Sequence, residues 1–165
     1  MSLFRRVGMY LSFALIYKAH AARYLLAAIR GEKAEGVRAI IIDENRVLLV
    51  RHWYAPWAWT LLGGGIARNE EPEEAAIREA REETGLVLRT IAGKIGIYKG
   101  VVGKNDKVHV FYTRDFEGSL AMKPNLEIMA RSWFDIDNLP LELSPANRRR
   151  IEAYRSGQRN ESGKW

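Results

Sequence analysis

A helix-forming block that follows a run of three glycines constrains this chain more than any other feature of its sequence. The block places Glu79, Glu82 and Glu83 at relative positions i, i+3 and i+4, so a helix would present the three carboxylates on one face. Like charges this close repel one another, which indicates that a cation binds between them. Carboxylate oxygens are ligands that Mg2+ prefers. We therefore predict a divalent-metal site on this helix.

The residues that flank the block predict a loop followed by a helix. Gly63, Gly64 and Gly65 have no side chains, so their backbone can approach a phosphate group or offer the carbonyl oxygen of Gly63 to a metal ion. Pro72 suits the first turn of a helix, and Gly85 suits its C-terminal end. The pattern predicts a helix that begins at Pro72 and ends just before Gly85, with its acidic face next to the glycine loop.

The spacing across residues 64–86 resembles the signature box of the Nudix hydrolases. The matching residues are Gly64, Glu70, Arg78, Glu79, Glu82, Glu83, Thr84, Gly85 and Leu86. A solvated helix face with ion pairs such as Arg78–Glu82 is the competing interpretation. The glycine loop and Gly85 disfavour that interpretation, because a merely solvated helix does not need them.

Three residues depart from the usual pattern of the box. Leu62 replaces a proline before the glycine pair, Asn69 replaces a glycine before the first glutamate, and Ala80 replaces a bulky aliphatic residue. None of the three is a metal ligand in the family. Asparagine tolerates a left-handed backbone better than most residues, so we expect the turn at Asn69 to form. We interpret the three departures as variation in packing.

The resemblance implies metal-dependent cleavage of a pyrophosphate bond, with one to three Mg2+ or Mn2+ ions. The ligands that it implies are Glu79, Glu82, Glu83 and the carbonyl oxygen of Gly63. Arg78 would orient the carboxylates, and Glu70 would fix the loop. Glu127 resembles the downstream glutamate that many members place opposite the box helix, although a lone loop glutamate is commonly only solvated. Either Glu82 or Glu127 would be the general base.

The expected substrate is a small nucleotide. We favour a nucleoside diphosphate linked to another moiety, such as a sugar nucleotide or ADP-ribose, with nucleoside triphosphates second, and no single residue decides between them. The candidate substrate-binding residues are Gly64, Gly65, Trp53, Tyr54 and Trp57. Aromatic rings stack on nucleobases, but His52, Trp59 and others in this run can equally be core residues. A non-catalytic nucleotide-binding sensor is the alternative function, which the complete glutamate set disfavours.

Residues 4–30 form a second informative segment, because they contain no proline and most of them are apolar. On a helix, five polar residues would share one sector: Arg5, Ser12, His20, Arg23 and Arg30. This pattern predicts a basic, apolar helix. Its longest uncharged run has 11 residues, well short of the ~20 that span a bilayer. Packing against this domain or against a second subunit is the main interpretation. A peripheral membrane anchor and a secretory signal are the alternatives.

Composition and charge limit the classes of protein. A length of 165 residues, 47% of them hydrophobic, suits one domain with a core. The chain has no cysteine, which excludes a disulfide framework and fits a cytoplasmic location. The net charge of +6 originates in the termini, so we expect no nucleic-acid partner. The scattered His20, His52 and His109 are expected to be structural, and arginines 148–150 to lie on a solvated helix face.

The pattern of apolar runs predicts an α/β fold. Expected strands lie at residues 37–42, 47–50, 59–62, 87–91, 94–99, 108–116 and 130–134, the first two as a hairpin, with a last helix over 145–155. A mixed sheet between helices is consistent with this order, and the resemblance implies the α/β/α Nudix sandwich over residues 36–156. Residues 1–35 would form the N-terminal helix and linker, and residues 157–165 a polar tail.

Overall fold

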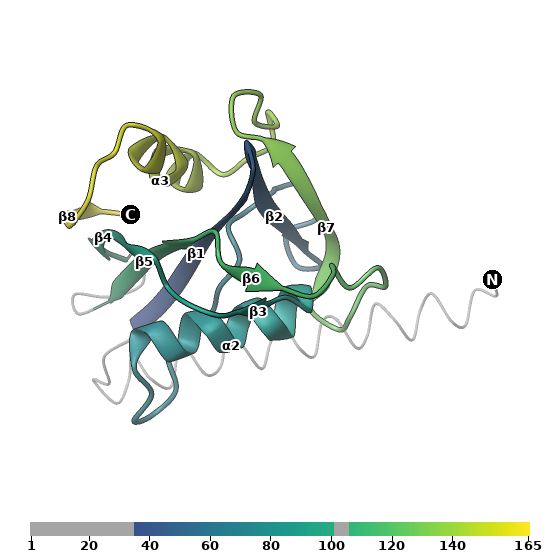
Figure 1. The fold of residues 1–165 in the computed structure, drawn as a ribbon, viewed down its shortest axis with the longest axis horizontal. Helices are drawn as coiled ribbons and strands as arrows, with labels where there is room; N and C mark the ends of the chain where they lie inside the picture. Colours follow the sequence, from purple (N-terminus) through teal and green to yellow (C-terminus); the bar gives the residue numbers. More distant parts are fainter. Residues whose placement is uncertain (1–34, 101–105) are drawn as a thin grey trace.

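The computed structural model describes residues 35–100 and 106–165. A six-stranded mixed sheet of order β7-β2-β1-β5-β4-β8 lies between helices α2 and α3 (Figure 1). The elements are β1 (Glu35–Asp43), β2 (Arg46–His52), α2 (Pro72–Thr84), β3 (Val87–Leu88), β4 (Gly93–Lys99), β5 (Lys107–Thr113), β6 (Phe116–Glu117), β7 (Ile128–Asp135), α3 (Pro145–Arg155) and β8 (Glu161–Lys164). Strands β3 and β6 form a separate two-stranded sheet. The predicted α/β/α sandwich is confirmed.

Part of the sequence prediction lies outside the described residues. The basic apolar helix over 4–30, most of its linker and His20 fall within residues 1–34. Their packing against protein or membrane therefore stays a prediction. Within residues 35–100 and 106–165, no helix is long and apolar enough to cross a membrane.

Strands β1 and β2 form the predicted hairpin. Asp43 pairs with Arg46, which leaves Glu44 and Asn45 as a two-residue turn. Glu44 has a φ of 52°, the left-handed backbone that tight turns between antiparallel strands require. The side-chain amide of Asn45 donates to Oδ2 of Asp137 at 3.0 Å. The turn is therefore tied to the segment that follows β7.

Alternate residues of the central strands face different helices. Ile40 of β1 packs in the cluster that contains Ile151 of α3. Its neighbour Ile41 packs in the cluster that contains Ala80 of α2. Because successive side chains of a strand point to opposite faces, both faces of the sheet are apolar and both are covered. This explains why β1 reads as a continuous hydrophobic run.

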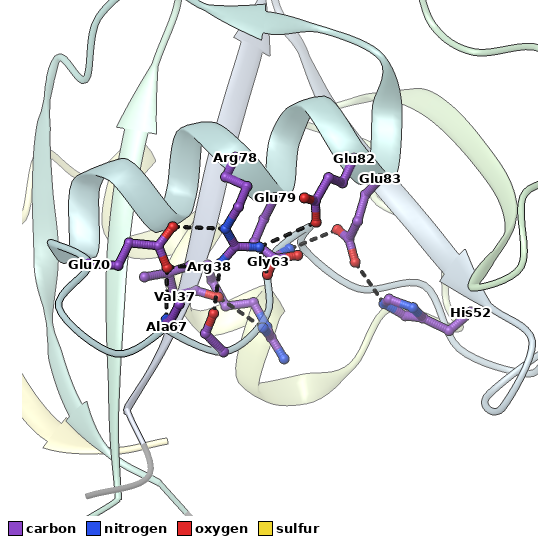
Figure 2. A network of polar contacts seen from close by, with 11 residues as sticks. Val37, Arg38, His52, Gly63, Ala67, Glu70, Arg78, Glu79, Glu82 and Glu83 are labelled. Carbon is purple, nitrogen blue, oxygen red and sulfur yellow. Dashed lines mark hydrogen bonds and ion pairs between the residues drawn. The ribbon is translucent and has the colours of Figure 1, made fainter. Parts of the chain in front are cut away.

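Helix α2 has the predicted bounds, Pro72–Thr84. It ends at Gly85, whose φ of 83° is a conformation that glycine adopts without the steric penalty of a Cβ atom. Ala76 and Ala80 are fully buried, so the helix packs on the core through small side chains. Glu79 and Glu83 of α2 then lie beside the glycine loop (Figure 2).

Three predicted strands differ from those observed. Residues 59–62 make only isolated bridges to their neighbours. The strand predicted over residues 87–91 is only as long as β3, and the strand predicted over residues 108–116 is divided into β5 and β6. The division occurs where the hydroxyl of Thr113 accepts the amide of Asp115 and the chain turns. Hydrophobic alternation does not detect such bonds between a side chain and the backbone.

The C-terminus departs most from the sequence prediction. Residues 157–165, predicted as a polar tail, contribute β8, which pairs in parallel with β4. Arg150 is buried, and its Nη2 donates to the carbonyl of Lys164 at 2.7 Å. The Arg150 guanidinium carbon lies 3.5 Å from the centre of the Tyr98 ring. The prediction of a solvated face was wrong for Arg150, because a guanidinium can be buried against a carbonyl and an aromatic ring.

Tyr98 offers a test of this C-terminal packing. Its hydroxyl donates to Oε2 of Glu161 at 2.7 Å, and burial raises the pKa of Tyr98 to about 12. An unfolded tyrosine ionises near pH ~10, so this stabilisation is complete below about pH 10 and is lost as the pH rises through about 12. We expect Tyr98→Phe to lower the free energy of unfolding by about 1 kcal/mol at neutral pH. The free energy of unfolding, measured by urea denaturation, should fall less above pH ~10 for the variant than for the wild type. Equal falls in the two proteins would contradict the prediction.

Candidate active site

The glycine loop lies between β1 and α2. The amide of Val37 donates to the carbonyl of Gly64 at 2.9 Å, and the amide of Ala39 to the carbonyl of Leu62 at 3.0 Å. Gly63 has a φ of 136°, and a Cβ atom there would lie 2.2 Å from the carbonyl oxygen of Val37. The loop backbone therefore packs directly against β1, next to the acidic side of α2 (Figure 2).

Arg78 joins the loop to the helix. Its Nε and Nη2 donate to the two carboxylate oxygens of Glu70 at 2.7 and 3.0 Å, and Nη2 also donates to the carbonyl of Gly65 at 2.9 Å. Glu70 accepts the amide of Ala67 at 2.7 Å as well. The hydrogen bond from Arg78 is the main reason that the pKa of Glu70 is lowered. Asn69, just before Glu70, has the left-handed backbone expected from its sequence, with a φ of 63°.

Arg78 also contacts two of the predicted metal ligands. Its Nη1 donates to Oε1 of Glu79 at 2.6 Å and to Oε2 of Glu82 at 3.3 Å. Burial raises the pKa of Glu79, and the hydrogen bond from Arg78 opposes that rise. A Cβ atom on Gly64 would lie 2.5 Å from Oε1 of Glu79, so the missing side chain leaves room for this carboxylate. The side chain of Glu82 is 61% exposed and faces solvent.

Glu83 is a buried carboxylate, with only 3% of the residue exposed. Its Oε2 accepts the amide of Gly63 at 2.8 Å. Burial raises the pKa of Glu83 to about 8, although the bond from Gly63 and the charge of Arg38 act in the opposite direction. Arg131 of β7 donates from Nε to the backbone carbonyl of Glu83 and ties the end of α2 to the sheet. Neither Arg38 nor Arg131 belongs to a sequence motif that could have identified it.

His52 and Glu127 complete a cluster around Glu83. Nε2 of His52 lies 3.8 Å from Oε1 of Glu83, as the dashed line in Figure 2 shows. One ligand atom from each of the three residues lies within 4.8 Å of the others. Glu79 and Glu82, which are predicted to share an ion with Glu83, contact Arg78 instead. The sequence predicts a structural role for the scattered histidine His52. The folded chain instead places Glu127, through the pairing of β2 with β7, and Glu83, from α2, beside it.

The aromatic residues that precede the loop differ in their surroundings. Trp59 packs against the hydrophobic core on the α3 side of the sheet. The indole N–H of Trp53 donates to the carbonyl of Asn125 at 3.0 Å. Tyr54 is 46% exposed and Trp57 is 70% exposed. Of the aromatic candidates for substrate binding, Tyr54 and Trp57 therefore present the most ring surface to a ligand.

The donor set of this site fits a divalent cation. The negative charges of Glu79 and Glu127 add to burial in raising the pKa of Glu83. Acids held this close repel one another when ionised, and a bound cation would remove that penalty. The glutamates offer hard oxygen ligands, and His52 offers an imidazole nitrogen. The amide of Gly63 is the group seen in contact with Glu83, and its carbonyl stays a predicted ligand.

The fold and this site together define a Nudix-type α/β/α domain with an acidic helix packed beside a glycine loop. The sequence model of the NUDIX domain family matches residues 32–154 of the chain. The chain therefore belongs to the Nudix hydrolases, a family of pyrophosphohydrolases whose members generally use divalent metal ions.

Known proteins similar to this chain carry related names. It is 33% identical over 124 residues to the "Putative 8-oxo-dGTP diphosphatase" of Bacillus subtilis, covering 74% of this chain and 80% of that protein. It is 30% identical over 112 residues to the "ADP-ribose pyrophosphatase" of Methanocaldococcus jannaschii, covering 65% of this chain and 64% of that protein. The crystal structure of a MutT NUDIX hydrolase from Burkholderia pseudomallei superposes with a TM-score of 0.64 at 27% identity, covering 73% and 96% of the two chains.

Proposed function

We propose that this chain is a metal-dependent pyrophosphohydrolase that cleaves a nucleoside triphosphate to the monophosphate and pyrophosphate. The observation that carries the proposal is the set of glutamates around the glycine loop. Arg78 orients Glu79 and Glu82, and Glu83 is buried and close enough to other acids to favour a bound cation. The similarity to the Bacillus protein supports a triphosphate, which is the second choice of the sequence prediction after a sugar nucleotide or ADP-ribose.

The residues of the site have distinct roles in this proposal. A divalent ion bound here would neutralise the phosphate oxygens and lower the pKa of the attacking water. Glu79, Glu83 and Glu127 are the ligands that we propose for it. Glu82 would accept the proton of the water, because its carboxylate is open to solvent and close enough to Glu79 for its charge to act on that ligand. Arg78 holds Glu79 in place through a charge-assisted hydrogen bond of 2.6 Å.

The loop and the exposed rings would bind the remainder of the nucleotide. Gly64 and Gly65 have no side chains to separate the loop backbone from the phosphates. Tyr54 and Trp57 are exposed and precede this loop, so either ring can stack on the base. ADP-ribose is the second candidate substrate. The similarity to the Methanocaldococcus protein supports it, although the chain covers a smaller share of that protein.

Substrate turnover tests the proposal directly. Nucleoside triphosphates that include 8-oxo-dGTP, sugar nucleotides and ADP-ribose are incubated with the protein and Mg2+ or Mn2+, and the release of monophosphate is measured. We expect turnover of triphosphates, and Glu82→Gln should reduce it about 100-fold or more, as for the loss of a general base. Glu73→Gln, an exposed glutamate at the start of the same helix, is the matched control and should keep full activity.

Two other results of that experiment would change the proposal. Turnover of ADP-ribose but not of triphosphates would replace the substrate class and leave the hydrolase intact. A folded protein that binds nucleotide and metal but turns over none of the panel would instead indicate a nucleotide-binding sensor.

A further inference from the structure

An irregularity in the sheet determines where His52 lies. The pairing of β2 with β7 shifts register just before His52, which pairs with Ile128 and leaves Met129 as an extra residue. A bulge of this kind bends the strand and redirects the side chains next to it. The amide of Trp53 then donates to the carbonyl of Glu127 at 3.1 Å. The ends of the two strands thus bring His52 and Glu127 together at the C-terminal end of α2.

The imidazole of His52 is buried and oriented. Only 4% of the residue is exposed, and its ring stacks on Tyr54 with 4.7 Å between ring centres and 20° between ring planes. Nε2 faces Oε1 of Glu83, 3.8 Å away (Figure 2). This separation is too long for a hydrogen bond and places a nitrogen beside a buried carboxylate.

The distances in this cluster suit one shared ion. Imidazole nitrogens and carboxylate oxygens bind divalent ions at about 2.0–2.2 Å, so two ligands of one ion lie no more than about 4.4 Å apart. The ligand atoms of His52, Glu83 and Glu127 lie within 4.8 Å of one another. Small side-chain movements would therefore bring all three atoms into contact with an ion at the centre.

We propose that Nε2 of His52 is a ligand of the ion held by Glu83 and Glu127, so that the site binds Mn2+ in preference to Mg2+. Imidazole nitrogen suits transition-metal ions, whereas Mg2+ favours oxygen ligands and retained waters. His52 would bind as the neutral ring with its proton on Nδ1. The inference rests on the proposed function only in that both need a divalent ion beside α2.

Pulsed electron paramagnetic resonance on bound Mn2+ tests this ligand directly, because a bonded nitrogen imposes a 14N modulation on the signal. The full chain is stripped of metal, titrated with Mn2+ and compared with His52→Gln. The matched control is His109→Gln, since His109 is also buried beside a glutamate, with 3.3 Å from its Nε2 to Oε2 of Glu35, but lies outside the cluster. Affinities for Mn2+ and Mg2+ are measured by calorimetry on all three proteins.

The expected result is a 14N modulation in the wild type and in His109→Gln that is absent from His52→Gln. The affinity of His52→Gln for Mn2+ should fall at least about 10-fold, with a change of less than about threefold for Mg2+. Bound Mn2+ without a 14N modulation in the wild type, or a modulation that survives in His52→Gln, would overturn the inference. Because these readouts need no turnover, an active enzyme that lacks the modulation refutes the His52 ligand and leaves the proposed function standing.

Discussion

Replacement of Glu83 by glutamine is expected to abolish most of the activity and, at the same time, to stabilise the metal-free protein at pH 8. The loss of a metal ligand from the centre of the site should lower turnover on the order of 1,000-fold. The gain in stability arises because Glu83 is buried among other acids and glutamine carries no charge there. Glutamine keeps an oxygen that can accept the amide of Gly63.

The pH range of this stabilisation follows from the raised pKa of Glu83, which is about 8 in the folded protein. An unfolded glutamate ionises near pH ~4.3. Between these values the unfolded chain has released the proton and the folded chain retains it, so the wild type loses stability as the pH rises from about 4.5 through 8. Glu83→Gln removes this loss, and we expect it to be about 2–4 kcal/mol more stable than the wild type at pH 8 and nearly equal at pH 4.5.

Thermal and urea unfolding of both proteins at pH 4.5, 6 and 8, with a chelator present, measure this effect. Added Mn2+ should then stabilise the wild type and not the variant, because an ion that binds only the folded state raises its stability by mass action. If the free energies of unfolding of wild type and variant differed by the same amount at all three pH values, Glu83 would be ionised in the folded, metal-free protein.

Replacement of Gly63 by alanine is expected to prevent stable folding, whereas Gly65→Ala should fold normally. A Cβ atom on Gly63 would lie 2.2 Å from the carbonyl oxygen of Val37, in a backbone with a φ of 136°. The strained backbone and the clash with β1 should together lower the free energy of unfolding by roughly 3–5 kcal/mol. A Cβ atom on Gly65 meets nothing within 4 Å.

Soluble expression, circular dichroism and urea denaturation of the two variants test this contrast. Each adds one methyl group to the same loop, so composition and helix propensity do not separate them. Equal stability of Gly63→Ala and Gly65→Ala would show that the loop can leave β1 without loss of the fold.

Local patterns predicted the helices and the hairpin well. The bounds of α2 and α3 agree with the sequence prediction, because proline at the start of each helix and Gly85 after α2 act within one turn of the chain. The turn at Glu44 and Asn45 is likewise local. The same short-range spacing predicted that the glutamates share one side of α2 and that the glycine loop lies next to them.

Other features depend on residues far apart in the sequence. β8 has little apolar character and forms because the backbone of β4 offers it hydrogen bonds. Arg150 looks solvated in its own helix, but Tyr98 and Lys164 surround it in the folded chain. Neither contact leaves a periodic signal, because the partners come from separate elements.

By itself, the sequence determined the family, the acidic helix and the glycine loop, because each of these depends on residue types at short, regular spacing. Only the tertiary structure decided how the acids form two groups. In the first group Glu79 and Glu82 bind Arg78, and in the second Glu83 lies beside His52 and Glu127. The second group depends on the bulge between β2 and β7, where His52 pairs with Ile128, more than seventy positions away, next to Glu127. Burial then sets the ionisation of Glu83, and burial is a property of the packed chain.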